Sequence, residues 1–251
     1  MQINSTEHSN DLVEHRFTVG DIPGILWIPA SATPTRPAPL LLAGQPGALP
    51  GMEATRPRLA QRAAGAARAG FATATIELPG GAGRSQPDGA EEARQELRAA
   101  ATAGEPIPDD LVERLILPLV AQAVPEWQLV LDALLEVPTL GPHVGCSGGL
   151  ISVSIRLARV EPRVKAAVLF AGSFVPRVML GEAREVTVPL HMLVQWDDRT
   201  NDRQRALELF DAFGSPEKTL TANMGGHQGV PAHAGDAAQN FLSRHLSPIT
   251  R

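Results

Sequence analysis

Short apolar runs recur along the chain, and most of them end in glycine, proline or polar residues. The run Leu-Leu-Leu-Ala at 40–43 is too short for a helix and is followed by Gly-Gln-Pro-Gly, through which neither a helix nor a strand can continue. Uninterrupted apolar runs of this length are typical of strands that are covered on both faces of a sheet. Further strands are predicted over 71–78, 142–145, 164–171, 189–195 and 218–223.

The segments between these runs favour helices. Residues 56–69 are rich in alanine, and Gly70 follows at the position where glycine commonly ends a helix. Pro118 and Pro125 are expected to interrupt or kink a helix over 111–137, because proline lacks the backbone N–H that a helix needs. Further helices are predicted over 90–103, 150–159, 202–213 and 234–245, and a hairpin over 16–29.

The alternation of strands and helices predicts an α/β fold. Right-handed crossovers between successive strands would produce a mostly parallel central sheet with helices on both faces. We expect residues 1–251 to form a single domain of this kind, with a small lid insertion at about 84–125. Residues 174–188 also lie between core strands and are expected to contribute to the lid. Ligands of such folds bind at the carboxyl edge of the sheet, so the loops at that edge are the first place to look for chemistry.

Composition and charge exclude several classes of protein. With 43% hydrophobic and 20% charged residues, the chain has an average globular composition rather than a disordered or fibrous one. A formal net charge of -5, without a block of like charges, argues against nucleic acid or a membrane surface as partner. The single cysteine precludes an intrachain disulfide, and the polar start, expected to be a tail, has no signal peptide. Since no run of 18 apolar residues is present either, we expect a soluble, cytoplasmic protein.

Sequence motifs for metal ions and nucleotides are missing. The chain has no His-Glu-x-x-His and no paired histidine–carboxylate spacing of the kind that indicates a metal site. The glycine-rich stretch 80–84 follows a predicted strand, but Gln86 occupies the third glycine position of a dinucleotide motif, and no Gly-Lys-Ser/Thr is present. The sequence therefore predicts neither a metal ion nor a cofactor.

A candidate nucleophile lies between a predicted strand and a predicted helix. Residues 145–149 read GCSGG, which matches the pattern G-x-S-x-G with Ser147 at its centre. A nucleophile on such a sharp turn has a strained backbone, and the small residues two positions before and after it prevent collisions. If Cys146 were the central residue, the branched Val144 would have to occupy the first small position. The pattern therefore favours Ser147, and Cys146 is expected to be a small buried hydrophobic residue.

A candidate acid and a candidate base follow in the order expected for a serine nucleophile. The strand predicted over 189–195 is followed by Trp-Asp-Asp, which provides Asp197 and Asp198. The last predicted strand is followed by a glycine-flanked His227. A serine hydroxyl needs a base to take its proton, and that base needs an orienting carboxylate. Asp198 is preferred as this carboxylate, with Asp197 as the alternative.

Five stretches of the chain resemble motifs of the α/β-hydrolase superfamily, in the order of that family. The likeness is greatest to small dienelactone-hydrolase-like esterases, and the second stretch, IELPGGAGRS, is similar to the family pattern D-x-P-G-x-G-x-S. Together the stretches span nearly the whole body of the chain. They are residues 41–47, 76–85, 145–149, 194–201 and 225–231.

The resemblance implies an α/β-hydrolase fold and a role for each of three residues. Ser147 would be the nucleophile, His227 the general base and then the general acid, and Asp198 the orienting carboxylate. Dienelactone hydrolases themselves use a cysteine where this chain has Ser147. The usual His-Gly of the oxyanion loop is replaced here by Gln-Pro, and proline has no N–H to donate. The expected oxyanion donors are therefore the amides of Gly148 and Gly47.

The sequence thus predicts a serine hydrolase that cleaves a carboxylic ester, thioester or lactone through an acyl-enzyme on Ser147. Its expected partner is a small ester-type substrate. The alternative is a catalytically silent protein of hydrolase-like fold that serves as a binding module. The apolar stripe 111–120 is interpreted either as lid packing or as the contact of a homodimer.

Overall fold

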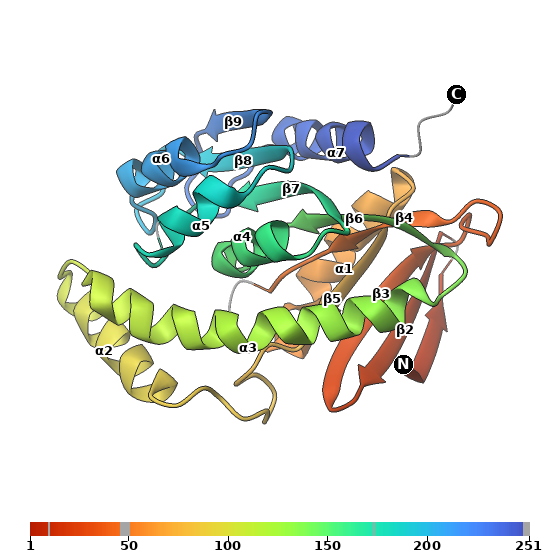
Figure 1. Ribbon diagram of the computed structural model, residues 1–251, viewed down its shortest axis with the longest axis horizontal. Coiled ribbons are helices and arrows are strands. Elements are labelled where there is room, and N and C mark those ends of the chain that lie inside the picture. The colour runs from red at the N-terminus through yellow and green to blue at the C-terminus, as the bar shows by residue number, and fades with distance from the viewer. Residues whose placement is uncertain (10, 46–50, 173, 248–251) are drawn as a thin grey trace.

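The computed structural model describes residues 1–9, 11–45, 51–172 and 174–247. Within these residues, strands form one mixed sheet in the order β1-β2-β3-β5-β4-β6-β7-β8-β9 (Figure 1). The pairs from β1 to β5 in this order are antiparallel, and those from β5 to β9 are parallel. The strands are β1 Gln2–His8, β2 Leu12–Val19, β3 Ile22–Pro29, β4 Ala38–Leu42, β5 Ala72–Ile76, β6 Leu140–Ser147, β7 Val164–Phe170, β8 Leu190–Gln195 and β9 Lys218–Asn223.

Helices connect the strands that follow β4 and cover the sheet. They are α1 Met52–Arg68, α2 Ala90–Ala103, α3 Asp109–Leu135, α4 Ile151–Val160, α5 Met179–Glu185, α6 Arg203–Ala212 and α7 Ala232–Leu246. Figure 1 shows α3 and α4 in front of the sheet and α1 behind it. The expected α/β fold with a mostly parallel sheet and helices on both faces is confirmed.

Strand β4 shows how the two faces are buried. Leu40 and Leu42 belong to the main hydrophobic cluster, which they share with α3, α4, α5 and α6. Leu41, between them, belongs to a second cluster with α7, which α1 joins through Ala66. Successive side chains of a strand point to opposite faces, so a strand with helices on both sides is apolar at every position.

Two elements lie where the sequence predicted none. The start of the chain was expected to be a tail, but it forms β1, an edge strand with every side chain exposed. A polar strand without a buried face has no alternation of apolar and polar residues, so hydrophobic patterning cannot detect it. Helix α5 lies within 174–188, which was expected to be part of a lid.

Helix α3 runs without a break through Pro118 and Pro125, so the predicted interruption is wrong, and the alternative of a kink stays a prediction. Each proline removes one backbone N–H, but tertiary packing of the apolar face supplies most of a helix's stability. In the part of the chain that is described, α3 is also long and apolar enough to cross a bilayer, a criterion that core helices of soluble proteins meet as well. Val112, Ile116 and Val120 of the stripe 111–120 lie in the main cluster. The stripe is thus occupied by packing within the chain, and a homodimer stays a prediction.

Candidate active site

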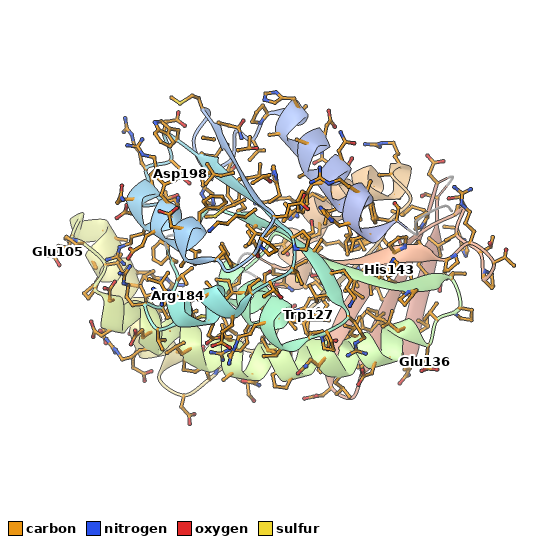
Figure 2. All side chains as sticks on the ribbon, turned by 45° about the horizontal axis from the view of Figure 1, so that its top comes forward. Glu105, Trp127, Glu136, His143, Arg184 and Asp198 are labelled. Atoms are coloured by element: carbon orange, nitrogen blue, oxygen red, sulfur yellow. The ribbon has the colours of Figure 1, made fainter. Side chains whose placement is uncertain are left out.

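The three residues singled out by the sequence lie at one edge of the sheet. Ser147 is the last residue of β6, Asp198 follows β8, and His227 follows β9. Strands β6 to β9 are parallel neighbours, so their carboxyl ends meet at the same edge. Figure 2 shows Asp198 near α6 and well apart from Trp127, which lies on α3.

Asp198 and His227 form a direct pair. Nδ1 of His227 lies 2.6 Å from Oδ2 of Asp198. The other carboxylate oxygen accepts hydrogen bonds from the backbone N–H and the hydroxyl of Thr200, at 2.8 and 2.7 Å. Desolvation acts to raise the pKa of Asp198, but the hydrogen bonds from Thr200 and His227 outweigh it, so that the pKa is lowered. Asp198 is therefore an ionised carboxylate that fixes the orientation of the imidazole.

Asp197, the alternative acid, contacts the backbone of the histidine loop instead of the ring. Its Oδ1 accepts hydrogen bonds from the N–H groups of Gly225 and Gly226, both at 2.9 Å. The bond from Gly226 is the largest cause of the lowered pKa of Asp197. The two adjacent aspartates thus hold different parts of the loop: Asp197 binds its backbone, and Asp198 binds the imidazole of His227.

Ser147 and His227 both line a cleft of about 870 Å³, together with residues of α1 and α7. Nη2 of Arg62 on α1 donates to Oγ of Ser147 at 3.2 Å. Among the hydrogen bonds of the described residues, none joins Oγ of Ser147 to the imidazole of His227. The structure therefore brings Asp198 and His227 into contact, and it places Ser147 in the same cleft with a different partner.

The turn after Ser147 differs from the expected one. Helix α4 starts only at Ile151, and Gly148 and Gly149 have φ values of 64° and 88°. Ser147 is not among the residues with positive φ. Because glycine adopts the left-handed region without strain, the two glycines make the sharp turn, and the serine has no positive φ. A Cβ at position 149 would lie 2.3 Å from Cα of Gly44, so this turn meets the loop after β4 backbone to backbone.

Of the two expected oxyanion donors, Gly148 lies within the described residues and Gly47 lies outside them. The amide of Gly148 donates to the carbonyl oxygen of Val168 at 2.9 Å, because β6 pairs with β7 as far as its last residue. An amide held in this way must leave its bond before it can donate to a substrate. The role of both amides stays a prediction.

Arg62 is the residue of this site that the sequence analysis missed. Besides Oγ, its Nη2 donates to the carbonyl oxygen of Ser147 at 3.0 Å. The buried positions of α1 include Leu59, Ala63 and Ala66, and Arg62 flanks this stripe rather than lying opposite to it. The helical spacing is a usable signal, but only once it is known which face of α1 packs on the sheet.

Cys146, which precedes the serine, is no part of the site. It is 1% exposed and belongs to the main hydrophobic cluster. Desolvation raises the pKa of its thiol to about 12. A thiol that stays protonated is not a nucleophile at neutral pH. The expectation of a small buried hydrophobic residue is confirmed.

The segment 84–125, expected to be a lid, forms α2 and the first part of α3 (Figure 1). The described residues that line the cleft lie outside 84–125. They include Phe174, which belongs to the second segment expected in the lid, 174–188. A covering role for 84–125 therefore stays a prediction.

The other histidines near the sheet make hydrogen bonds within the chain. Nδ1 of His143 lies 2.9 Å from the carbonyl oxygen of Leu246, and Nδ1 of His191 lies 2.6 Å from Oγ1 of Thr219. Across the residues that the structure covers, no group of three or more histidine, cysteine, aspartate or glutamate side chains could hold a metal ion.

Solved structures resemble this chain over nearly its whole length, whereas no protein-family model and no curated protein matches it. A cold-adapted esterase from an Arctic intertidal metagenomic library is 23% identical, with 98% of this chain and 100% of that chain covered and a TM-score of 0.73. A Klebsiella pneumoniae protein provisionally described as a dienelactone hydrolase is 15% identical, with 93% and 98% covered and a TM-score of 0.65.

A third solved structure, acetyl xylan esterase 1 from Thermoanaerobacterium sp. JW/SL YS485, is 15% identical. The comparison covers 97% of this chain and 88% of that chain, with a TM-score of 0.58. Together with the strand order and the helices on both faces, these likenesses show that the chain has the α/β-hydrolase fold. The fold implied by the sequence resemblance is confirmed.

Proposed function

We propose that the protein is a serine hydrolase that cleaves a carboxylic ester, thioester or lactone through an acyl-enzyme on Ser147. The observation that carries the proposal is the 2.6 Å contact between His227 and Asp198 in a cleft that Ser147 also lines. An imidazole held by a buried carboxylate, beside a serine hydroxyl, is the arrangement that serine hydrolases use. The esterases of the same fold support the class of reaction.

The proposed reaction uses these three side chains. Oγ of Ser147 attacks the carbonyl carbon of the substrate while Nε2 of His227 takes the hydroxyl proton, and the ionised Asp198 stabilises the imidazolium. The imidazolium then gives the proton to the leaving oxygen or sulfur, and the acyl group remains on Ser147. A water molecule, deprotonated by the same imidazole, hydrolyses the acyl-enzyme and restores the serine.

The proposed reaction requires one rotation in the site. Oγ of Ser147 contacts Arg62 and has to turn towards His227 when the substrate is bound. Catalytic hydrogen bonds are often long or poorly aligned without substrate and tighten in the complex. The proposal therefore expects Ser147 to change partner by rotation of its hydroxyl about the Cα–Cβ bond.

The second candidate is the catalytically silent binding module, and the contact between Oγ of Ser147 and Arg62 favours it. A serine whose Oγ contacts a guanidinium rather than an imidazole is not activated by a base. The ordered pair of Asp198 and His227 weighs against this candidate, because a binding module has no need of an oriented imidazole.

Removal of the Ser147 hydroxyl tests the two candidates. Ser147→Ala is expected to lower kcat for a neutral ester such as p-nitrophenyl acetate by about 10⁶-fold, because no other group replaces the nucleophile. Ser243→Ala on α7, outside the residues that line the cleft, is the matched control and is expected to keep wild-type turnover. Steady-state kinetics and the Tm of each variant are measured. Substantial turnover by a folded Ser147→Ala protein would refute the serine mechanism.

A covalent probe separates an enzyme with a different substrate from a silent protein. A fluorophosphonate is expected to form an adduct on Ser147 of the wild-type protein, detected by mass spectrometry of the peptide that contains residue 147. The absence of an adduct, together with no turnover of a panel of esters, thioesters and lactones, would favour the binding module.

A further inference from the structure

The negative charge that develops on an attacked carbonyl oxygen needs hydrogen-bond donors. The backbone donor next to Ser147, the amide of Gly148, is bonded to the carbonyl oxygen of Val168 at 2.9 Å. The donor that already contacts the serine is a side chain. Nη2 of Arg62 lies 3.2 Å from Oγ of Ser147 and 3.0 Å from its carbonyl oxygen.

The glycine after the serine gives this guanidinium its place. A Cβ at position 148 would lie 2.9 Å from Nη2 and 3.3 Å from Nη1 of Arg62. The φ of Gly148 is 64°, a conformation that residues with a side chain seldom adopt. Both features keep the volume beside Ser147 open, and the guanidinium of Arg62 fills it.

Arg62 brings a positive charge to the nucleophile without an acidic partner. Within the described part of the chain no ion pair includes Arg62, whereas Arg56 on the same helix pairs with Glu14 and Glu7. The side chain is exposed in the cleft, and its pKa is lowered by desolvation first and by the charge of Arg58 second. An arginine stays protonated at neutral pH nonetheless, because the ordinary pKa of a guanidinium lies far above neutral.

Helix α1 fixes the backbone of Arg62, and two hydrogen bonds to Ser147 hold its exposed side chain. Leu59, Ala63 and Ala66 are buried on the face that packs against the sheet. The first amide of the helix, on Met52, donates to Oε2 of Glu77 at 2.8 Å, which satisfies one of the free N–H groups at the helix start. The bond from Nη2 to the carbonyl oxygen of Ser147 does not depend on Oγ, so it can keep the guanidinium in place when charge appears, and a donor already in place is what makes an oxyanion site effective.

We propose that Arg62 is a catalytic residue that stabilises the oxyanion formed when Ser147 attacks its substrate, an inference that rests on the proposed function. As the bond from Oγ to the carbonyl carbon forms, the π electron pair of the carbonyl moves onto its oxygen and the serine proton passes to His227. Once Oγ has turned to the imidazole, Nη2 of Arg62 is free to donate to that oxygen. Arg62 keeps its own protons throughout, so the step needs no further reactant.

Substitution of Arg62 in the full-length protein tests the inference. With neutral p-nitrophenyl acetate, Arg62→Met is expected to lower kcat by about 10²- to 10³-fold, the usual loss for one oxyanion donor. KM should change little, because the charge develops only in the transition state. In Arg62→Ala, added ethylguanidinium is expected to restore part of the lost kcat. If Arg62 had only a structural role, ethylguanidinium would not restore kcat. The absence of rescue would therefore overturn the inference.

Two further arginines serve as comparisons. Arg98→Met, on the exposed side of α2, is the matched control and is expected to keep the wild-type kcat. Arg58→Met removes another positive charge that lines the cleft. If it lowers kcat as much as Arg62→Met does, the effect comes from the overall positive charge of the cleft, and the specific role of Arg62 is overturned. A loss in Arg62→Met confined to a negatively charged ester would indicate binding of the substrate charge and would also overturn it.

The failure of this inference is distinguishable from the failure of the proposed function. If Ser147→Ala keeps its turnover, the serine mechanism is wrong. If Ser147→Ala is inactive, a fluorophosphonate labels Ser147 in the wild type, and Arg62→Met keeps its kcat, only the role of Arg62 is overturned.

Discussion

Asp197 and Asp198 are neighbours with identical side chains, yet they contact different parts of the histidine loop. Asp198 pairs with the ring of His227, and Asp197 accepts the amides of Gly225 and Gly226. The sequence could narrow the proposed orienting acid to these two residues because both follow a predicted strand. Which of them points at the ring depends on the turn after β8, whose geometry hydrophobic patterning does not specify.

Paired substitutions separate the two aspartates. Asp198→Asn is expected to lower kcat by about 10⁴-fold, because an amide cannot hold the imidazole in the required tautomer as a carboxylate does. Asp197→Asn keeps an oxygen that accepts the glycine amides and should retain most of the turnover. Steady-state kinetics on a neutral ester measures both variants, and a larger loss at position 197 would contradict the assignment.

At the scale of elements, the turn between β6 and α4 connects the fold to the site. The sequence located Ser147 because an apolar strand ends there in a glycine-rich pattern, and Asp198 and His227 because they follow strands. It could not show that the amide of Gly148 pairs with Val168, because register between strands is a long-range property. Arg62 was missed because a charged residue on a helix is ordinarily part of a solvent-facing surface. Its contact with Ser147, like strand register, depends on residues far apart in the sequence.

The close approach of this turn to the loop after β4 leads to a prediction about stability. Gly149→Ala places a Cβ 2.3 Å from the backbone of Gly44, at a residue with φ of 88°. The free energy of unfolding is expected to fall by at least about 2 kcal/mol, and the turnover with it. Denaturant unfolding measures the loss.

Gly181→Ala in α5 is the matched control for this substitution. Nothing lies within 4 Å of its added Cβ, and its φ is not positive. Alanine in a helix is favoured over glycine by up to about 1 kcal/mol, so this variant should be as stable as the wild type or more stable. Equal losses in the two variants would mean that the contact with Gly44 is unimportant.

At the scale of the whole molecule, the sequence predicted the sheet and the helices that cover it, but it missed the edge strand β1. Central strands such as β5 and β8 are buried at every position, and the sequence predicted both, although each also contains buried polar residues. Strand β1 is exposed at every position, so its polar residues left no pattern to find. Its polar side chains suit the edge of a sheet, where an apolar strand would invite pairing with other molecules.

The stability of the whole molecule should depend on pH through Glu77, which is 1% exposed behind the start of α1. Desolvation raises the pKa of Glu77, despite the hydrogen bond from Met52. The carboxyl of Glu77 therefore stays protonated up to a higher pH in the native state than in the unfolded state, where glutamates titrate at about 4.3. The contribution of Glu77 is complete below that pH and is lost as pH rises through the raised pKa.

Replacing Glu77 by glutamine removes this dependence. Glu77→Gln keeps an oxygen for the amide of Met52 and carries no charge, so its free energy of unfolding at pH 7 to 8 should exceed that of the wild type. The difference should vanish in acid. Denaturant unfolding from pH 4 to 8 measures the effect, with Glu105→Gln, an exposed residue at one end of the molecule (Figure 2), as control. A constant difference between wild type and Glu77→Gln at all pH values would exclude the titration of Glu77 as its cause.

The burial of Cys146 has a practical consequence for the study of this molecule. It is the sole sulfhydryl of the chain, and inside the core it is closed to maleimides and to oxidants at neutral pH. A cysteine introduced at an exposed position such as Met224, in the loop that leads to His227, would then be the one place where a dye attaches. Movements of the histidine loop on addition of an ester can thus be followed by fluorescence with the native core intact.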